Sequence, residues 1–184
     1  MIEISNLTKH LDKKKIISNF SFSANHPECL GLFGEDRIAK TALLQLISGS
    51  TQPSSGYIKI QGFNTQTHPS KARKFVGYQL DQNLDHPTLS VKAFLEFIAA
   101  MRGLRGSEKR ARVEEAATRL DLLPALNAPL DALSMGLKRR VAIAQAILHA
   151  PALLLLDEPT EGMAPDQKHH FKALIQSLTQ EMTV

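Results

Sequence analysis

A short polar motif near the N-terminus carries side chains that could bind phosphate. It reads Gly34-Glu35-Asp36-Arg37-Ile38-Ala39-Lys40-Thr41. It follows an apolar run and precedes a helical pattern, which is the context of a phosphate-binding loop. Backbone N–H groups at a helix start bind phosphate oxygens, Lys40 suits the outer phosphates and the Thr41 hydroxyl suits Mg²⁺. Ala39 stands where such loops have glycine. The alternative is therefore that the match arises by chance in an ordinary strand–loop–helix segment that binds no phosphate.

A second motif places two acids directly after an aliphatic run. It reads Leu154-Leu155-Leu156-Asp157-Glu158-Pro159-Thr160. An aspartate at the end of a buried strand beside a phosphate loop suits binding of Mg²⁺. Glu158 could orient or deprotonate an attacking water. The alternative is a strand that ends in an ordinary polar turn.

The third motif begins a helix. It reads Leu133-Ser134-Met135-Gly136-Leu137-Lys138-Arg139-Arg140-Val141. Ser134 is a predicted N-cap, and its hydroxyl and the free N–H groups behind it form an anion site. The alternative is a capped helix with a basic first turn. The cations at 138–140 oppose the helix dipole, so helix stability does not explain them.

Strands and helices that would position these motifs alternate along the chain. Strands are predicted at 1–4, 16–22, 29–33, 57–60, 75–79 and 152–156, and Lys13, Lys14 and Lys15 at a hairpin tip. Helices are predicted at 41–47, at 136–148, at 165–180, and as a pair between 91 and 126. The run at 152–156 is typical of a strand buried on both faces of a parallel sheet. The pattern predicts an α/β fold with a parallel core, an N-terminal antiparallel β part and an inserted helical subdomain.

Composition favours one well-buried core. The chain has 184 residues, 43% of them hydrophobic, and a net charge of +4, which suits an anionic partner or an ordinary basic protein. Cys29 is the only cysteine, and its apolar surroundings predict a buried, inert thiol. The N-terminus has no signal-peptide pattern, and the longest apolar run, 151–156, is too short to span a bilayer. Any membrane role would therefore come through a partner.

The order of the three motifs resembles the ATP-binding subunits of ABC transporters, and among these the ABC-2 exporter branch of gliding-motility and multidrug type. The resemblance implies a P-loop NTPase (RecA-like) fold, ATP and Mg²⁺ as cofactors, and ATP hydrolysis with Glu158 as the catalytic residue. The implied nucleotide-binding residues are Gly34, Glu35, Asp36, Arg37, Ile38, Ala39, Lys40, Thr41 and Ala42. The implied signature residues are Leu133, Ser134, Met135, Gly136 and Leu137, and the implied Mg²⁺ residues are Thr41, Asp81 and Asp157.

The same resemblance implies an assembly. Residues 1–82 and 136–184 would form the two halves of the nucleotide-binding core, and 83–135 the helical subdomain. An ABC-2-type permease would dock on that subdomain, with Leu84, Leu89 and Phe94 in the docking surface. The chain would pair as a homodimer or heterodimer with another ATP-binding subunit, and would bind no nucleic acid. It would be cytoplasmic, peripheral to the inner (plasma) membrane through the permease.

The chain departs from the family pattern where nucleotide chemistry is expected. Leu11 replaces the aromatic residue that stacks on adenine, and Arg37 and Ala39 replace glycines. Glu35 and Asp36 add negative charge beside a triphosphate. Ala164 stands in place of an aspartate, and the sequence stops before the family's switch histidine. We expect weak or absent ATPase activity, and two alternatives stay open: a non-hydrolysing structural or regulatory partner, and a soluble ABC protein of translation or DNA repair.

Overall fold

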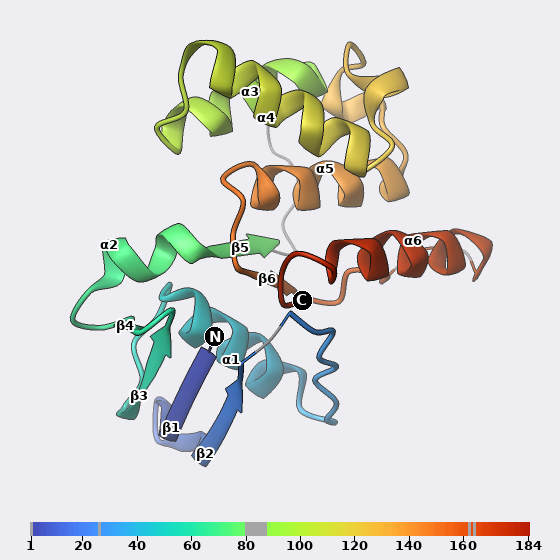
Figure 1. Cartoon of the computed structure of the whole chain (residues 1–184). Coiled ribbons are helices and arrows are strands. Elements are labelled where there is room, and N and C mark those ends of the chain that lie inside the picture. The colour runs from blue at the N-terminus through green and yellow to red at the C-terminus, as the bar shows by residue number, and fades with distance from the viewer. Residues whose placement is uncertain (1, 26, 80–87, 162, 164) are drawn as a thin grey trace.

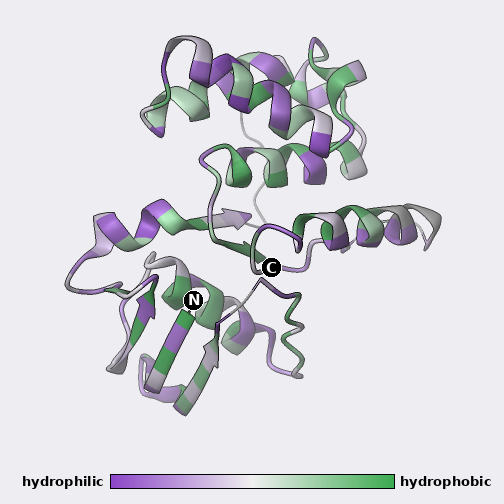
Figure 2. Cartoon of the chain, viewed as in Figure 1, coloured by the Kyte–Doolittle hydropathy of each residue, from purple (hydrophilic) through white to green (hydrophobic). Residues whose placement is uncertain are grey.

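The N-terminal part of the protein is an antiparallel sheet. A computed structural model describes residues 2–25, 27–79, 88–161, 163 and 165–184. The strands are ordered β2-β1-β3-β4; they comprise β1 (Ile2–Leu11), β2 (Lys14–Ala24), β3 (Ser55–Ile60) and β4 (Phe63–Asn64). Alternate residues of β1 are buried at Ile2 and Ile4, and Figure 2 shows the matching bands of hydropathy. β1 and β2 form the predicted hairpin, but its tip is the turn at Asp12 and Lys13, because Lys14 and Lys15 already pair with β1 as the start of β2.

Two parallel strands form the centre of the molecule. β5 (Val76–Gln79) pairs in parallel with β6 (Leu153–Leu156). Leu154 packs into a cluster formed by the helices, whereas Leu153 and Leu155 pack into a second cluster with the antiparallel sheet and α1 (Arg37–Ser48). β6 is therefore buried on both faces, as its aliphatic run predicts.

Helices cover the other face of these strands. They are α3 (Val91–Met101), α4 (Gly106–Arg119), α5 (Met135–Ile147) and α6 (Pro165–Leu178), with short helical turns at Leu123–Ala125 and Leu130–Ala132. The short helices α2 (Pro69–Ala72) and Arg73–Phe75 instead connect β4 to β5. In Figure 1, α3 and α4 lie above α5, and α5 lies above β5 and β6, with α1 and the antiparallel sheet below. Within the described residues, no helix is both long and apolar enough to cross a bilayer. The division at 82/83 and 135/136 stays a prediction, since residues 82 and 83 lie outside the described residues.

Close packing of α5 against β5 depends on a glycine. A Cβ atom at Gly77 would collide with the backbone carbonyl of Ala146, so only glycine lets this helix approach the strand so closely. Gln145 of α5, and His149 just after the end of α5, also bind carbonyl groups of β5: Gln145 Nε2 donates to Tyr78 O at 3.3 Å, and His149 Nε2 lies 3.0 Å from Val76 O. The helix that carries the third motif is thus fixed to the parallel strands.

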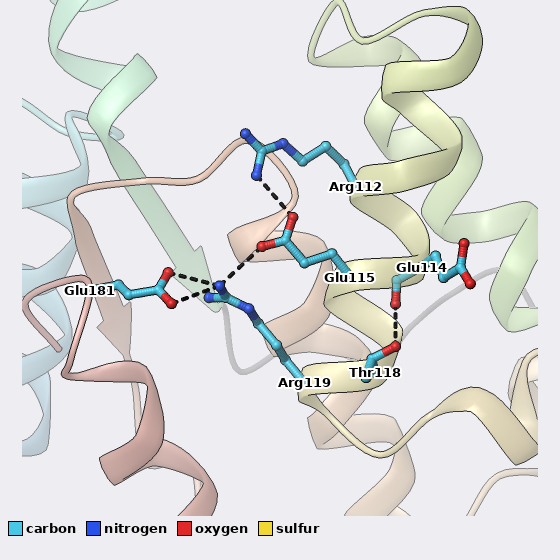
Figure 3. Close-up of polar contacts among 6 residues, drawn as sticks. All are labelled: Arg112, Glu114, Glu115, Thr118, Arg119 and Glu181. Atoms are coloured by element: carbon cyan, nitrogen blue, oxygen red, sulfur yellow. Dashed lines mark hydrogen bonds and ion pairs between the residues drawn. The ribbon is translucent and has the colours of Figure 1, made fainter.

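An ion-pair network joins the helical part to the chain end that follows α6. Arg119 Nη2 of α4 contacts Glu115 Oε1 at 3.0 Å and Glu181 Oε2 at 2.7 Å. Arg112 completes the chain of charges by contacting Glu115 Oε2 at 2.9 Å (Figure 3). Arg119 therefore bridges two acids that are distant in sequence and holds α4 against the C-terminal turn.

The strand predicted at 29–33 is wrong. These residues form no regular element, and Cys29, predicted to be buried, is exposed. The segment pairs with the rest of the protein only near its start, where Leu30 N–H donates to Val184 O at 2.8 Å and Val184 N–H donates to Glu28 O at 2.9 Å. A strand needs a continuous hydrogen-bonded neighbour, and beyond Leu30 this segment pairs with none among the described residues.

Candidate functional site: a groove between the start of α1 and the end of β6

The phosphate-loop motif folds into the first turn of a helix. α1 begins at Arg37, earlier than the predicted start at Thr41, because Asp36 caps it. Asp36 Oδ1 accepts a hydrogen bond from Ala39 N–H at 3.1 Å, and Asp36 O accepts one from Lys40 N–H at 3.2 Å. Aspartate is among the strongest N-cap residues. Residues 37–40 therefore take a helical form, and two of their amides are already bonded.

The two acids of the second motif lie where β6 ends. Asp157 is 7% exposed, although aspartate is rarely buried without a partner. Glu158 turns the chain sharply away from the strand, with a φ of 44° in the left-handed region. Its carboxylate Oε1 lies 3.0 Å from Lys40 Nζ. The fold thus brings the lysine of the first motif to the acids of the second.

These side chains line one groove, which we call the Lys40 groove. It has a volume of about 480 Å³, and its polar wall includes Lys40, Asp157 and Glu158. The rest of the wall is mainly apolar and comes from the segment 29–33, from β1 and β2, from α1 and from β6. Charged groups at one end of an otherwise apolar groove are typical of a small-molecule site.

A second ion pair joins the start of α1 to the turn after β6, although neither of its residues lines the groove. Arg37 Nη1 lies 3.0 Å from Glu161 Oε1, and Arg37 Nη2 lies 2.7 Å from Glu161 Oε2. This two-pronged geometry is the strongest form of an arginine–carboxylate pair. Glu161 could not be found from the sequence, because no spacing rule links it to Arg37, 124 positions away.

A buried tyrosine hydroxyl lies near Asp157. Tyr78 of β5 has a pKa raised to about 12, first because its hydroxyl is buried and second because it faces the negative charge of Asp157. The Tyr78 hydroxyl has no hydrogen-bond partner among the described residues. A charged carboxylate in such a place favours a cation as ligand. Tyr78 was also missed, since nothing in its sequence context distinguishes it from a core residue.

The third motif lies away from the groove. Ser134 caps α5 as predicted, because its Oγ accepts from Leu137 N–H at 3.3 Å. Arg140 Nη1 contacts Leu120 O at 3.3 Å and Asp121 Oδ2 at 3.0 Å, at the C-terminal end of α4. That contact gives one of the unexplained cations a structural role, because cations stabilise helix C-termini. None of residues 133–137 lines the Lys40 groove.

The predicted Mg²⁺ residues are only partly brought together. Asp157 lines the groove, whereas Thr41 is half-buried and does not. Asp81 and Ala164 lie outside the described residues. Among the residues that the structure describes, no group of three or more His, Cys, Asp or Glu side chains could hold a metal ion.

Comparison with known proteins identifies the family. The sequence profile of the ABC transporter family matches residues 17–161. The chain therefore belongs to the ABC transporter family, and it corresponds to the ATP-binding domain of that family.

Individual relatives agree with this assignment. The chain is 29% identical to the ABC transporter ATP-binding protein NatA of Bacillus subtilis over 186 residues, covering 98% of this chain and 76% of NatA. It is 31% identical to the linearmycin resistance ATP-binding protein LnrL of Bacillus subtilis, covering 100% of this chain and 60% of LnrL. It is 35% identical to the mouse organic anion transporter ABCA8A, covering 90% of this chain but only 10% of that protein. The chain thus spans a part of these relatives.

Solved structures give the same fold. The structure of cbiO1 from Clostridium perfringens, part of the ABC transporter complex cbiONQ, matches with a TM-score of 0.87 and 26% identity, over 98% of this chain and 74% of that one. The dimeric ABC transporter cassette MJ0796 matches with a TM-score of 0.83 and 24% identity, over 98% and 84%, and shows the fold alone. The predicted P-loop NTPase fold class is confirmed.

Proposed function

We propose that this chain binds Mg–ATP in the Lys40 groove and acts as the ATP-binding subunit of an ABC-2-type exporter. One observation carries the proposal: Lys40, Asp157 and Glu158 line the same groove, although they come from the start of α1 and the end of β6. A lysine at a helix start opposite acids at a parallel strand's carboxyl end suits a metal-bound triphosphate. The names of LnrL and of the Nod factor export ATP-binding protein I of Ralstonia nicotianae, 31% identical, support a role in export.

Each side chain has a proposed task. Lys40 binds the outer phosphates, and Glu158, once released from Lys40, orients a water molecule. The carboxylate of Asp157 fits a role in holding Mg²⁺, because it is buried, lines the groove and finds no hydrogen-bond donor among the described residues. Thr41, and Asp81 outside the described ranges, would complete the Mg²⁺ residues. The metal supplies positive charge that offsets the charge of the phosphates.

A second ATP-binding subunit is part of the proposal. Residues 133–137 lie at the start of α5, a place suited to an anion, but do not line the Lys40 groove of their own chain. In a homodimer or heterodimer they would reach the nucleotide bound to the other subunit. The solved structure of the MJ0796 cassette is dimeric.

The permease would dock on the helical part. Phe94, expected in that docking surface, is 5% exposed and belongs to the core, so this expectation is wrong. On the same helix α3, Phe97 is 51% exposed and Met101 is 71% exposed. Residues four apart share one face of a helix, so these two present an apolar surface suited to a permease segment. This docking would hold the chain at the cytoplasmic face of the inner (plasma) membrane.

A non-hydrolysing subunit is the second candidate. The Lys40–Glu158 pair occupies both side chains that hydrolysis needs, at 3.0 Å. Ala39 and Arg37 also add side chains to a loop in which phosphate requires close backbone approach. Such a chain would bind nucleotide weakly and support an active partner.

Calorimetry with Mg–ATP tests the proposal. We expect weak binding by the wild type, no binding by Lys40→Ala, and unchanged binding by Lys92→Ala, which removes an exposed lysine of α3. We expect Arg37→Gly/Ala39→Gly to bind at least about tenfold more tightly, or about 1.4 kcal/mol. Tight wild-type binding that survives Lys40→Ala would place the nucleotide elsewhere and refute the proposed site.

A further inference from the structure

We propose that Asp36, Glu158 and Glu161 hold the phosphate loop in a closed form, in which acidic side chains occupy the donors meant for phosphate. Glu161 is then a positioning residue that controls nucleotide affinity through Arg37. This inference rests on the proposed function, because it concerns the access of Mg–ATP to the same loop. Contacts to three different donors of the loop carry it.

The first contact lies at the start of α1. Asp36 Oδ1 accepts the N–H group of Ala39 at 3.1 Å. Amides in the first turn of a helix are the groups that bind phosphate oxygens. The Asp36 carboxylate has the same sign of charge as phosphate, so the two compete for the Ala39 amide.

The other contacts join the loop to the turn that follows β6. Arg37 holds both carboxylate oxygens of Glu161, at 3.0 and 2.7 Å, and Lys40 holds Glu158 at 3.0 Å. Glu158 and Glu161 belong to a single turn, because Glu161 N–H donates to Glu158 O at 3.0 Å. This turn therefore presents one carboxylate to each cation of the loop.

To bind at the loop, a triphosphate must displace these carboxylates, so that its own oxygens contact the donors of the loop. Arg37 and Glu161 are both exposed, and exposed ion pairs are weak, so exchange is feasible and the closed form tunes affinity rather than preventing binding. Removing Glu161 should therefore tighten binding only a few fold. Its effect should require Arg37, because Glu161 acts through that side chain.

The decisive variant is Glu161→Gln. We expect it to bind Mg–ATP about threefold to fivefold more tightly than the wild type. Tripolyphosphate, a second probe without a nucleoside, should show the same gain. Glu108→Gln is the control: it removes one negative charge from an exposed position of α4 that belongs neither to the loop nor to the Lys40 groove. We expect this control to change affinity less than about twofold. In an Arg37→Gln background the gain from Glu161→Gln should disappear.

Asp36 offers a second, independent pair of variants. Asp36→Asn keeps a side-chain acceptor for the Ala39 amide, whereas Asp36→Gly frees that amide. We expect Asp36→Gly to tighten tripolyphosphate binding more than Asp36→Asn. Equal effects of the two substitutions would mean that charge alone matters, and would overturn the role of the occupied amide.

Hydrogen exchange in the protein without nucleotide separates this inference from the proposed function. Release of Arg37 should speed exchange of the amides of 37–40 in Glu161→Gln but not in Glu108→Gln. If no variant binds either probe, the proposed function fails, and exchange alone decides: faster exchange supports the closed loop and unchanged exchange overturns it. Equal tightening by Glu161→Gln and Glu108→Gln, or a gain that survives Arg37→Gln, overturns the role of Glu161.

Discussion

Lys40 Nζ lies 3.0 Å from Glu158 Oε1, so the proposed phosphate-binding and water-orienting side chains neutralise each other. The pair links α1 to the turn after β6, and both side chains are only partly exposed. Nucleotide binding at Lys40 must therefore release Glu158. The two proposed steps, binding of phosphate and orientation of water, become coupled through this single contact.

Glu158→Gln tests that coupling. The amide cannot form an ion pair with Lys40, so we expect Mg–ATP to bind about twofold to fivefold more tightly, the range for a partly exposed ion pair. Any ATPase activity of the chain should be lost, because an amide cannot act as a base. Calorimetry and phosphate release measure the two effects. Glu108→Gln, on exposed α4, is the control and should change neither. Unchanged affinity in Glu158→Gln would contradict the coupling.

Gly77→Ala tests the contact between β5 and α5. The added Cβ meets the backbone carbonyl of Ala146, which cannot move without shifting the helix. We expect a loss of about 1–3 kcal/mol in the free energy of unfolding, typical of overpacking. Urea denaturation measures it. Gly34→Ala is the matched control, because a Cβ there meets no atom within 4 Å, and it should stay within about 0.5 kcal/mol. Equal stability of both variants would rule out the close approach.

The sequence predicted the elements whose signals are local. The aliphatic run of β6, the Ser134 cap of α5 and the start of α6 at Pro165 were all found, because burial, capping and proline each act within a few residues. The run at 29–33 misled, since an apolar pattern predicts a strand only when a neighbouring strand completes its hydrogen bonds.

The candidate site was predicted only in part. Motif spacing led to Lys40, Asp157 and Glu158, and their shared groove supports that choice. The pair between Arg37 and Glu161 and the proximity of Tyr78 to Asp157 could not be found. Such contacts depend on how α1, β5 and β6 pack together, which no local pattern encodes.

Stability should depend on pH through His149. Burial, and then the charge of Arg102, lower the pKa of His149 from 6.5 to about 4, although its bond to Val76 O opposes this. Between these two pKa values the unfolded chain binds a proton at His149 and the folded chain does not. The free energy of unfolding therefore decreases as the pH falls below 6.5, and the stability associated with neutral His149 is lost by about pH 4. Because His149 is partly exposed, we expect at most about 2 kcal/mol.

The control for this pH effect is His149→Gln, whose amide can still donate to Val76 O but does not titrate. Urea denaturation at several pH values should give a flatter curve for the variant between pH 6.5 and 4. Subtracting the two curves removes the titration of carboxylates, which both proteins share. Parallel curves would show that His149 is neutral or charged to the same extent in both the folded and unfolded chain.

The proposed permease contact predicts a loss of membrane association that leaves the fold intact. Phe97 and Met101 are exposed on one face of α3, so Phe97→Ser/Met101→Ser should remove apolar contact with a partner and barely change stability. Phe94→Ala is the opposite case, because it empties a buried site and should cost about 3–5 kcal/mol. Co-purification with membranes that contain the permease, together with urea denaturation of each variant, separates docking from folding. Membrane association that persists in the double variant, with its stability unchanged, would move the docking surface away from this face of α3.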